Sequence, residues 1–388
     1  MLRVLSCAAL LMATSAQAET FRVDSTADAV DAVPGDGVCA TADEACTLRA
    51  AVQEANALPG ADRIRVPAGE YLLTRGGASE DDAVTGDLDL RGRLRVVGAG
   101  VGATIVDGNG LDRVFHVQPN ARVTLVKIAV RGGNGVDTSL GGGVNAESAS
   151  RVILKRLLVE DNEAFIGGGV ASTGVLRVVE TTIRQNIAAV GGGLAINAGS
   201  SIRSSTFNDN TATGVGLFTG HDIVAQGPGT VTIVNSTITG QIETFAFCIP
   251  ASGPCSEAAD VVLANVTANV VSRVSLGPSS GTFTIRNTIV QQCDADLISQ
   301  GYNFVAEEGC VILGNLNGVV VGDTPLLGSL KDNGGPTFTR LPVAVSEAVD
   351  GGHPSPPGSG GNACEATDQR GIERPLGMGC DIGAVEGH

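Results

Sequence analysis

Apolar and polar residues repeat with a period of 24 residues between Arg151 and Leu217. Each copy has an apolar residue eight positions before a central asparagine and another three positions before it. The three asparagines are Asn162, Asn186 and Asn210. A short fixed period is typical of solenoids, in which each repeat buries its apolar side by stacking on the next. The repeat therefore predicts a rod of stacked coils.

Alternation inside the repeat indicates strands. Val152 and Leu154, and then Leu157 and Val159, would face the core, because successive strand residues point to opposite faces. The alternation slips by one residue between Leu154 and Leu157, which predicts a bend between two short strands. Glycine clusters at 167–169 and 191–193 follow, and a degenerate cluster ends the third copy. Glycines predict a tight corner, because they turn at little steric cost.

These features predict an all-β chain folded as a parallel β-helix over residues 63–321. Roughly ten or eleven coils would make a rod of roughly 50 Å. We expect the aligned asparagines to stack at one corner as a hydrogen-bonded ladder. A second ladder is predicted where asparagines follow the apolar pairs of later coils, at Asn235, Asn265 and Asn287.

The two ends of the chain do not follow the repeat. Residues 1–18 have the charged start, apolar segment and Ala16-Gln17-Ala18 cleavage pattern of a signal peptide, so we expect a secreted or cell-surface protein. Residues 19–62 form a predicted N-terminal cap with a helix from Thr47 to Leu58. Prolines and glycines interrupt the pattern over 322–388, which predicts an irregular C-terminal cap. No later stretch is apolar for long enough to be a membrane helix.

Composition narrows the classes of partner. Of the 388 residues, 43% are hydrophobic and 3% aromatic, which fits a core of stacked aliphatic side chains and argues against disorder. The net charge of −16 argues against a nucleic-acid partner or an anionic membrane.

Eight cysteines remain after the signal peptide. Sequence alone leaves their connectivity open, but local pairing is the simplest arrangement in an exported protein. No pair has the spacing of a zinc site. The expected pairs are Cys39 with Cys46, Cys248 with Cys255, Cys293 with Cys310, and Cys364 with Cys380.

Motifs near both ends resemble a known family. Cys46-Thr47-Leu48-Arg49-Ala50-Ala51, followed by Glu54-Ala55-Asn56, resembles the bacterial CSLREA domain, with Thr47 and Ala51 in place of the usual Ser and Glu. The runs at 323–341, 368–371 and 380–384 resemble the choice-of-anchor Q domain. The resemblance implies a secreted, right-handed, pectate-lyase-like parallel β-helix, and it brings no established reaction. The glycine clusters and Phe207-Asn208-Asp209-Asn210 are also similar to polymorphic outer-membrane protein repeats.

An acidic loop is the one candidate metal site. Clustered carboxylates are the ligands that Ca²⁺ prefers, although the spacing is not that of an EF-hand and a solvated loop is the favoured interpretation. Calcium is therefore the only candidate cofactor. The candidate ligands are Glu80, Asp81, Asp82, Asp87 and Asp89.

Candidate catalytic residues are few. Lys155, Arg177 and Arg203 are expected at outward positions on neighbouring coils, with Lys155 two residues out of register with the other two. Such cations could serve a lyase, whereas solvated surface residues are the ordinary alternative. His116 is expected to face outward, and the four histidines are too scattered to form a ligand set.

The favoured function is a non-enzymatic, adhesin-like scaffold that binds a glycan or a cell surface. Two alternatives stay open: a polysaccharide lyase or glycoside hydrolase acting on acidic polysaccharide, and a purely structural extracellular rod. A groove holding three or more ionisable side chains from adjacent coils would favour the enzyme. Flat polar faces would favour binding, because the fold alone does not decide function.

Overall fold

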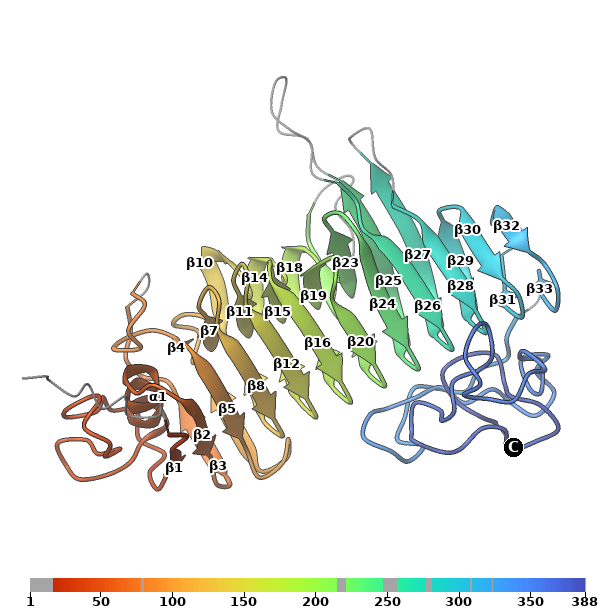
Figure 1. Cartoon of the computed structure of the whole chain (residues 1–388). Coiled ribbons are helices and arrows are strands. Elements are labelled where there is room, and N and C mark those ends of the chain that lie inside the picture. The colour runs from red at the N-terminus through yellow and green to blue at the C-terminus, as the bar shows by residue number, and fades with distance from the viewer. Residues whose placement is uncertain are drawn as a thin grey trace, which may run out of the picture.

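The chain winds into a rod of parallel coils (Figure 1). The computed structural model describes residues 17–77, 80–214, 221–246, 257–275, 281–307, 309–322 and 324–387. Almost all regular structure in these residues is β-strand, and every pairing between named strands is parallel. The parallel β-helix predicted from the repeat is confirmed. The signal peptide prediction falls almost entirely outside the described residues.

One face of the rod is a twelve-stranded sheet, here called sheet A. Each strand pairs with the equivalent strand of the next coil. In spatial order the strands are β1 (Thr20–Arg22), β2 (Ala61–Arg65), β5 (Arg93–Val97), β8 (Arg122–Val126), β12 (Arg151–Lys155), β16 (Val175–Val179), β20 (Ser201–Arg203), β24 (Thr230–Val234), β26 (Asp260–Ala264), β28 (Phe283–Arg286), β30 (Leu297–Gln300) and β32 (Ile312–Asn315).

A second sheet, sheet B, contains two columns of strands. The first column contains β3 (Gly69–Leu72), β6 (Thr104–Asp107), β9 (Ala129–Arg131), β13 (Leu158–Glu160), β17 (Thr182–Arg184), β21 (Thr206–Asn208), β25 (Thr237–Ala246), β27 (Thr267–Ser275), β29 (Ile289–Asp294), β31 (Phe304–Val305) and β33 (Val320–Val321). The second contains β4 (Leu88–Leu90), β7 (Phe115–Val117), β11 (Val144–Ala146), β15 (Val170–Ser172), β19 (Leu194–Asn197) and β23 (Ile223–Gln226). The columns join because the long strand β25 pairs with both β21 and β23.

A short third sheet follows the ladder asparagines and contains β10 (Asn134–Leu140), β14 (Glu163–Ile166), β18 (Ile187–Val190) and β22 (Thr211–Ala212). The glycine clusters come next. Gly167 and Gly191 have φ of 66° and 64°, and a Cβ on Gly168 would lie 2.3 Å from the carbonyl oxygen of Ile187. The clusters are therefore required by both backbone conformation and close coil packing. Most of the third, degenerate cluster lies outside the described residues.

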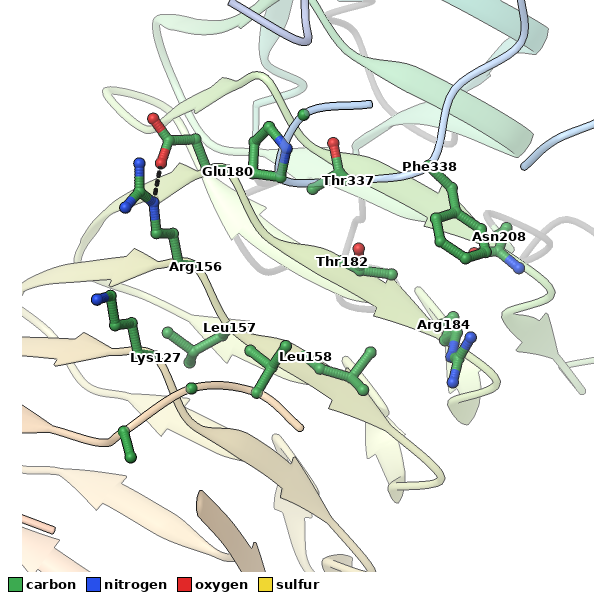
Figure 2. A pocket seen from close by; sticks show the side chains of 15 residues that line it. Lys127, Arg156, Leu157, Leu158, Glu180, Thr182, Arg184, Asn208, Thr337 and Phe338 are labelled. Carbon is green, nitrogen blue, oxygen red and sulfur yellow. Dashed lines mark hydrogen bonds and ion pairs between the residues drawn. The ribbon is translucent and has the colours of Figure 1, made fainter. Parts of the chain in front are cut away.

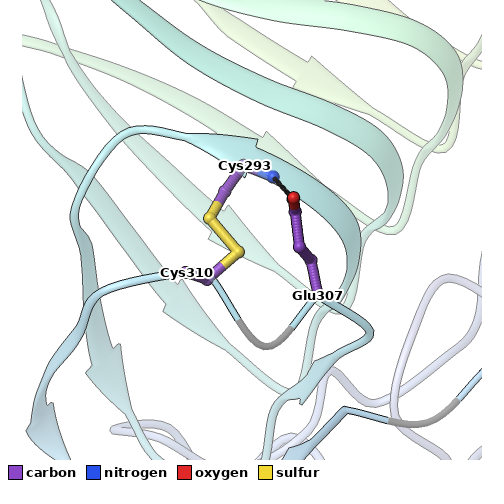
Figure 3. A group of neighbouring side chains, drawn as sticks. All are labelled: Cys293, Glu307 and Cys310. Carbon is purple, nitrogen blue, oxygen red and sulfur yellow. Dashed lines mark hydrogen bonds between the residues drawn. A yellow bond between two sulfur atoms is a disulfide. The ribbon is translucent and has the colours of Figure 1, made fainter.

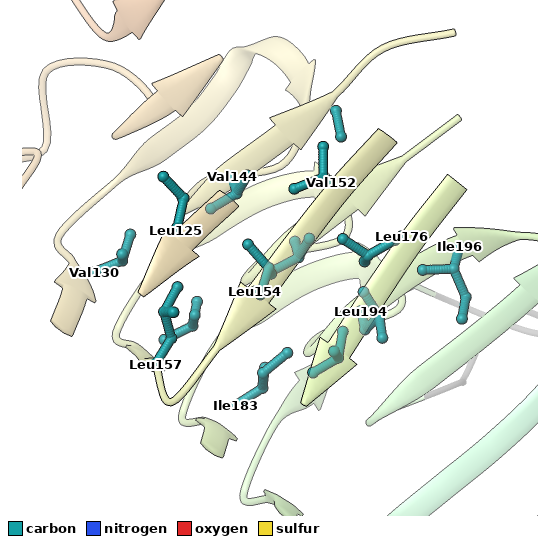
Figure 4. Packing of buried hydrophobic residues seen from close by; sticks show 14 of the residues in the cluster. Leu125, Val130, Val144, Val152, Leu154, Leu157, Leu176, Ile183, Leu194 and Ile196 are labelled. Atoms are coloured by element: carbon teal, nitrogen blue, oxygen red, sulfur yellow. The ribbon is translucent and has the colours of Figure 1, made fainter. Parts of the chain in front are cut away.

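The predicted bend separates sheet A from sheet B. Arg156, between β12 and β13, has φ of 56°, and Lys127 and Glu180 hold the same conformation on the neighbouring coils. The apolar residues on either side of this bend point inward and stack along the rod (Figure 4). Leu154, for example, lies between Leu125 and Val178 in the register of sheet A.

The asparagine ladder is present at the next corner. The side-chain Nδ2 of Asn162 donates to Oδ1 of Asn186 at 3.0 Å, and Asn186 donates to Asn210 at 2.9 Å. Asn210 then donates to Oδ1 of the buried Asp222 at 2.7 Å. Gly133 extends the ladder in the other direction, because its N–H donates to Asn162 at 2.9 Å.

The predicted second ladder is wrong. Asn235, Asn265 and Asn287 occupy the bend between the sheets with φ of 45–50°. Their amides bond to the C-terminal segment, defined here as residues 324–387, and not to one another. Nδ2 of Asn235 donates to the carbonyl of Thr367, and that of Asn287 donates to the carbonyl of Asn362. These residues anchor the returning chain.

The C-terminal segment is irregular and packs along the side of the later coils (Figure 1). Its Ala348 and Ile382 pack on Ile289 and Phe304 of sheet B. The segment extends back to Thr206, whose hydroxyl donates to the carbonyl of Phe338 at 2.5 Å. It therefore lies along the side of several coils, whereas Leu313 in the last strand of sheet A stays 51% exposed.

At the N-terminus, α1 (Leu48–Ala57) covers the first coils. Thr47 caps it by accepting from the Ala50 N–H at 3.0 Å. None of the described helices is long and apolar enough to cross a membrane.

Three of the expected local disulfides are formed, joining Cys39 to Cys46, Cys293 to Cys310, and Cys364 to Cys380. The pair Cys248 and Cys255 lies outside the described residues. Glu307 lies beside the second bridge and accepts from the Cys293 N–H at 3.0 Å (Figure 3). Because both sulfurs are in a disulfide, this cluster is not available to a metal ion.

Candidate functional site

A groove of about 740 Å³ lies along the bend between sheets A and B. Its lining residues come from successive coils and from the C-terminal segment (Figure 2). The groove therefore runs along the rod axis. The lining residues are Ala99, Gly100, Val101, Lys127, Arg156, Leu157, Leu158, Glu180, Thr182, Arg184, Asn208, Gly335, Pro336, Thr337 and Phe338.

The floor is formed by outward positions of sheet B. Leu158 and Thr182 are register partners on β13 and β17, and both are half-buried. One wall consists of Lys127, Arg156 and Glu180, which the left-handed bend turns outward on consecutive coils. The regular coil thus supplies a narrow floor beside a charged wall.

Most charges in the groove are paired. Arg156 Nε lies 2.5 Å from Glu180, and Arg184 lies 2.6 Å from Glu160 on the preceding coil. Among the described residues, Lys127 has no carboxylate partner within ion-pair distance. The groove therefore has one charged wall with a free ammonium group, and most of the rest of its lining is apolar.

Phe338 limits one end of the groove. Its backbone is held by the Thr206 hydroxyl, and Thr337 donates to the carbonyl of Ser204 at 3.3 Å. The ring remains 46% exposed. An exposed aromatic ring on a fixed backbone beside polar side chains offers a flat apolar surface to a ligand.

The predicted basic strip is in a different register. Lys155 aligns with Val179 and then with Arg203, so these two cations share one row. Arg177 lies in the neighbouring row, opposite Ile153. Arg203 also bonds Glu365 of the C-terminal segment at 3.2 Å. The expectation that Arg177 and Arg203 align is wrong, because the two residues differ by two positions relative to the repeat.

The acidic loop is only partly solvated. Asp87 and Asp89 are buried, which corrects the prediction of a solvated loop, whereas the side chains of Asp81 and Asp82 are 64% and 73% exposed. Glu80 accepts from the Thr85 N–H at 2.7 Å and so shapes the loop itself. Asp89 is buried because β4 pairs with β7 and places Asp89 directly opposite His116.

His116 faces away from the core, as expected, because Phe115 and Val117 on either side of it point inward, but the acidic loop lies against it and it is only 4% exposed. Its Nδ1 lies 2.9 Å from Asp89 and its Nε2 lies 3.0 Å from Glu147. Burial alone would lower the pKa of His116, but the hydrogen bonds to Asp89 and Glu147 and the nearby Asp87 raise it overall. The ring fastens the acidic loop to the coil.

Asp81, Asp89 and His116 offer ligand atoms within 4.8 Å of one another. Glu147 on the far ring nitrogen would fix the tautomer of a metal-ligating histidine. These are the described residues best placed to hold a divalent cation. Glu80, Asp82 and Asp87 have other partners: the loop backbone, Arg91 and Arg113.

The same cluster predicts a stability that falls as pH rises. Burial raises the pKa of Asp87 from 3.8 to about 7, against the lowering by Arg113. A group with a higher pKa in the folded chain stabilises it fully below the unfolded pKa and loses that effect as pH rises through the folded pKa. Stability should therefore fall between about pH 4 and pH 7 through Asp87, and further above the ordinary value of 6.5 through His116.

Urea denaturation from pH 5 to pH 8 checks this expectation. The Asp87→Asn variant should have a flatter profile, and Asp82→Asn, at an exposed loop position, should keep the wild-type slope. A wild-type stability that rises across this range would contradict the assignment.

Comparison with known proteins supports the fold. The crystal structure of pectate lyase Pel9A is similar, with a TM-score of 0.50 over 96% of each chain and 13% sequence identity. No family model and no curated protein matches the sequence. The chain is thus a right-handed, pectate-lyase-like parallel β-helix, and at this identity the likeness shows the fold alone.

Proposed function

We propose that the protein is a secreted or cell-surface β-helix scaffold that binds a glycan chain in the groove without cleaving it. The observation that carries the proposal is the groove itself: an axial channel with a half-buried floor, one charged wall and an exposed phenyl ring. Sugar rings present C–H groups on their faces and hydroxyls on their edges, and both kinds of surface are matched here.

The groove continues a row of outward threonines on sheet B that already binds an extended chain, the protein's own C-terminal segment. Thr206, Thr237 and Thr267 hold the same outward position on three successive coils, and each hydroxyl bonds the C-terminal segment. Thr182 precedes them in the same row and faces the groove. This surface therefore suits an extended chain that offers hydrogen-bonding groups.

Two observations support export of the protein. Its end motifs resemble the CSLREA and choice-of-anchor Q domains, and it has three disulfides. A disulfide-bonded rod in an extracellular setting would meet glycans of its own or a neighbouring cell. This is the setting in which a scaffold or adhesin acts.

A polysaccharide lyase or hydrolase is the second candidate. The groove holds ionisable side chains from adjacent coils, which favours an enzyme, and the neutral amine form of Lys127 could serve a lyase as a base. Arg156 and Glu180 neutralise each other, however, and Glu160 is engaged by Arg184. General acid–base catalysis would also need a second group free to exchange a proton, and Glu180, the one carboxylate among the described groove-lining residues, is held by Arg156, so binding is the better supported function.

Retention on immobilised glycans tests the proposal. Thr182→Tyr should fill the floor and Phe338→Ala should remove the ring, and each should weaken binding about tenfold, which corresponds to about 1.4 kcal/mol. The probes are neutral β-glucan and xylan columns.

Thr211→Tyr, on β22 outside the groove, is the matched control and should bind as wild type. Wild-type retention that both groove variants preserve would place the site elsewhere. An absence of retention on every column would favour the structural rod.

A further inference from the structure

The outward face of sheet A carries a dense array of cations. They occupy alternate positions on the strands from β1 to β16, with their apolar neighbours facing the core. This array is here called the arginine face: Arg22, Arg63, Arg65, Arg93, Arg95, Arg122, Arg151, Lys155 and Arg177.

The cations form rows along the rod because the strands are in register. Arg93, Arg122 and Arg151 are direct partners on three consecutive coils. Arg63 and Arg95 begin a parallel row that later reaches Arg177. Consecutive coils are about 4.8 Å apart, so neighbouring guanidinium groups repel one another when no anion lies between them.

No carboxylate in the described part of the chain pairs with these cations. The only acidic residue on β2, β5, β8, β12 and β16 is Asp62, which points inward, is 3% exposed and bonds the Glu19 N–H. Among the described residues, none of the cations of the arginine face has a carboxylate within ion-pair distance. In a chain of net charge −16, this concentration of unpaired cations singles out one face.

The arginine face also contains a concave site. A shallow hollow of about 250 Å³ lies on it, with Arg122, Arg151 and Arg177 around a floor of Thr124, Ile153 and Val175. The floor offers a hydroxyl and aliphatic carbons below three guanidinium groups. This combination could hold one ring of a ligand while the arginines bind its charged substituents.

We propose that the arginine face binds a linear carboxylate-bearing polysaccharide lying along the rod axis. Guanidinium groups bind planar carboxylates through two parallel hydrogen bonds, which favours carboxylates over a diffuse negative surface. Straight rows repeating once per coil match a linear polymer with a charge on each sugar. This surface is distinct from the groove, and its binding does not depend on the groove being a glycan site.

A slender ligand is also favoured by the rest of the charge distribution. The chain as a whole is strongly acidic, so a wide polyanion such as duplex DNA would meet repulsion beyond the edges of the arginine face. A single polysaccharide chain is narrow enough to remain over the rows.

The test measures binding of the protein to polygalacturonate and to its fully methyl-esterified form, which has the same backbone without the charge. Binding to polygalacturonate should weaken with added salt, because exposed charges are screened, and the ester should bind at least about tenfold more weakly. The Arg122→Gln/Arg151→Gln double variant should lose about tenfold or more in affinity.

The Arg273→Gln/Lys331→Gln variant removes the same charge away from the arginine face and should bind as wild type. Arg122→Lys/Arg151→Lys keeps the charge without the paired donors and should fall between the two. Thr182→Tyr, in the groove, should leave this binding unchanged, so the two sites can fail separately. Equal binding of the ester, tighter binding of DNA or dextran sulfate, no binding at all, or full affinity in the glutamine variant would each overturn the proposal.

Discussion

Replacement of Arg49 by methionine is expected to destabilise the protein by roughly 3–5 kcal/mol, because it leaves a buried carboxylate without its partner. The Arg49 side chain is 0% exposed and lies 2.5 Å from Asp28, whose side chain is 2% exposed. Its guanidinium also donates to the carbonyls of Ala83, Gly86 and Asp87. One side chain thus joins α1, the N-terminal loop and the acidic loop.

Urea denaturation followed by circular dichroism measures the effect as a change in the free energy of unfolding. Arg93→Met is the matched control, because it removes the same charge from an exposed position without an ion pair; it should change stability by less than about 0.5 kcal/mol. An Arg49→Met variant as stable as the control would show that the buried pair contributes little.

Replacement of Asn186 by leucine is the second change with a large expected effect. Asn186 is 0% exposed and accepts at Oδ1 from both the N–H and the Nδ2 of Asn162. It donates to the carbonyls of Val159 and Arg184 and to Asn210. A leucine of similar size would remove all of these bonds and leave the buried Asn162 N–H without its acceptor, so we expect a total loss of roughly 3–5 kcal/mol after relaxation.

Asn197→Leu is the control, because the side chain of this half-buried asparagine makes a single hydrogen bond, from Nδ2 to the Thr173 carbonyl. The Asn162→Leu/Asn186→Leu double variant adds a sharper test. Residues that share hydrogen bonds give non-additive changes, so the double variant should lose less stability than the sum of the single variants. Additive losses would contradict a connected ladder.

The sequence was most informative where geometry repeats. Leu154, Leu157 and Asn162 recur at fixed spacing because every coil places them in the same environment, so core, bend and ladder could all be predicted. Thr47 and the helix after it were also predictable, because an N-cap is a local signal. The disulfides followed from the short separations of their cysteines.

Contacts between segments far apart in the sequence could not be predicted. The end of the groove depends on Phe338 packing beside coils more than 100 residues earlier, and no local pattern indicates that return. The burial of His116 depends on a loop some 30 residues before it. Asn235 resembles a ladder residue in sequence, but its conformation at the bend directs its amide to the C-terminal segment.

The arginine face was only partly foreseen. Outward cations were expected at Lys155, Arg177 and Arg203, but the rows formed by the arginines of earlier coils were not. Strand pairing aligns Arg93 with Arg122 and Arg151. Repeat-based alignment finds such rows only where the coil length is constant.

The central claim is that the protein holds a glycan without cutting it. The most direct test incubates the protein with neutral and acidic polysaccharides, with and without calcium, and follows reducing ends, unsaturated uronate absorbance and retention on the same immobilised glycans. We expect retention on at least one glycan, lost in groove or arginine-face variants, with no new product over a long incubation. Product formation that Lys127→Ala abolishes would contradict it and assign the groove to a lyase or hydrolase.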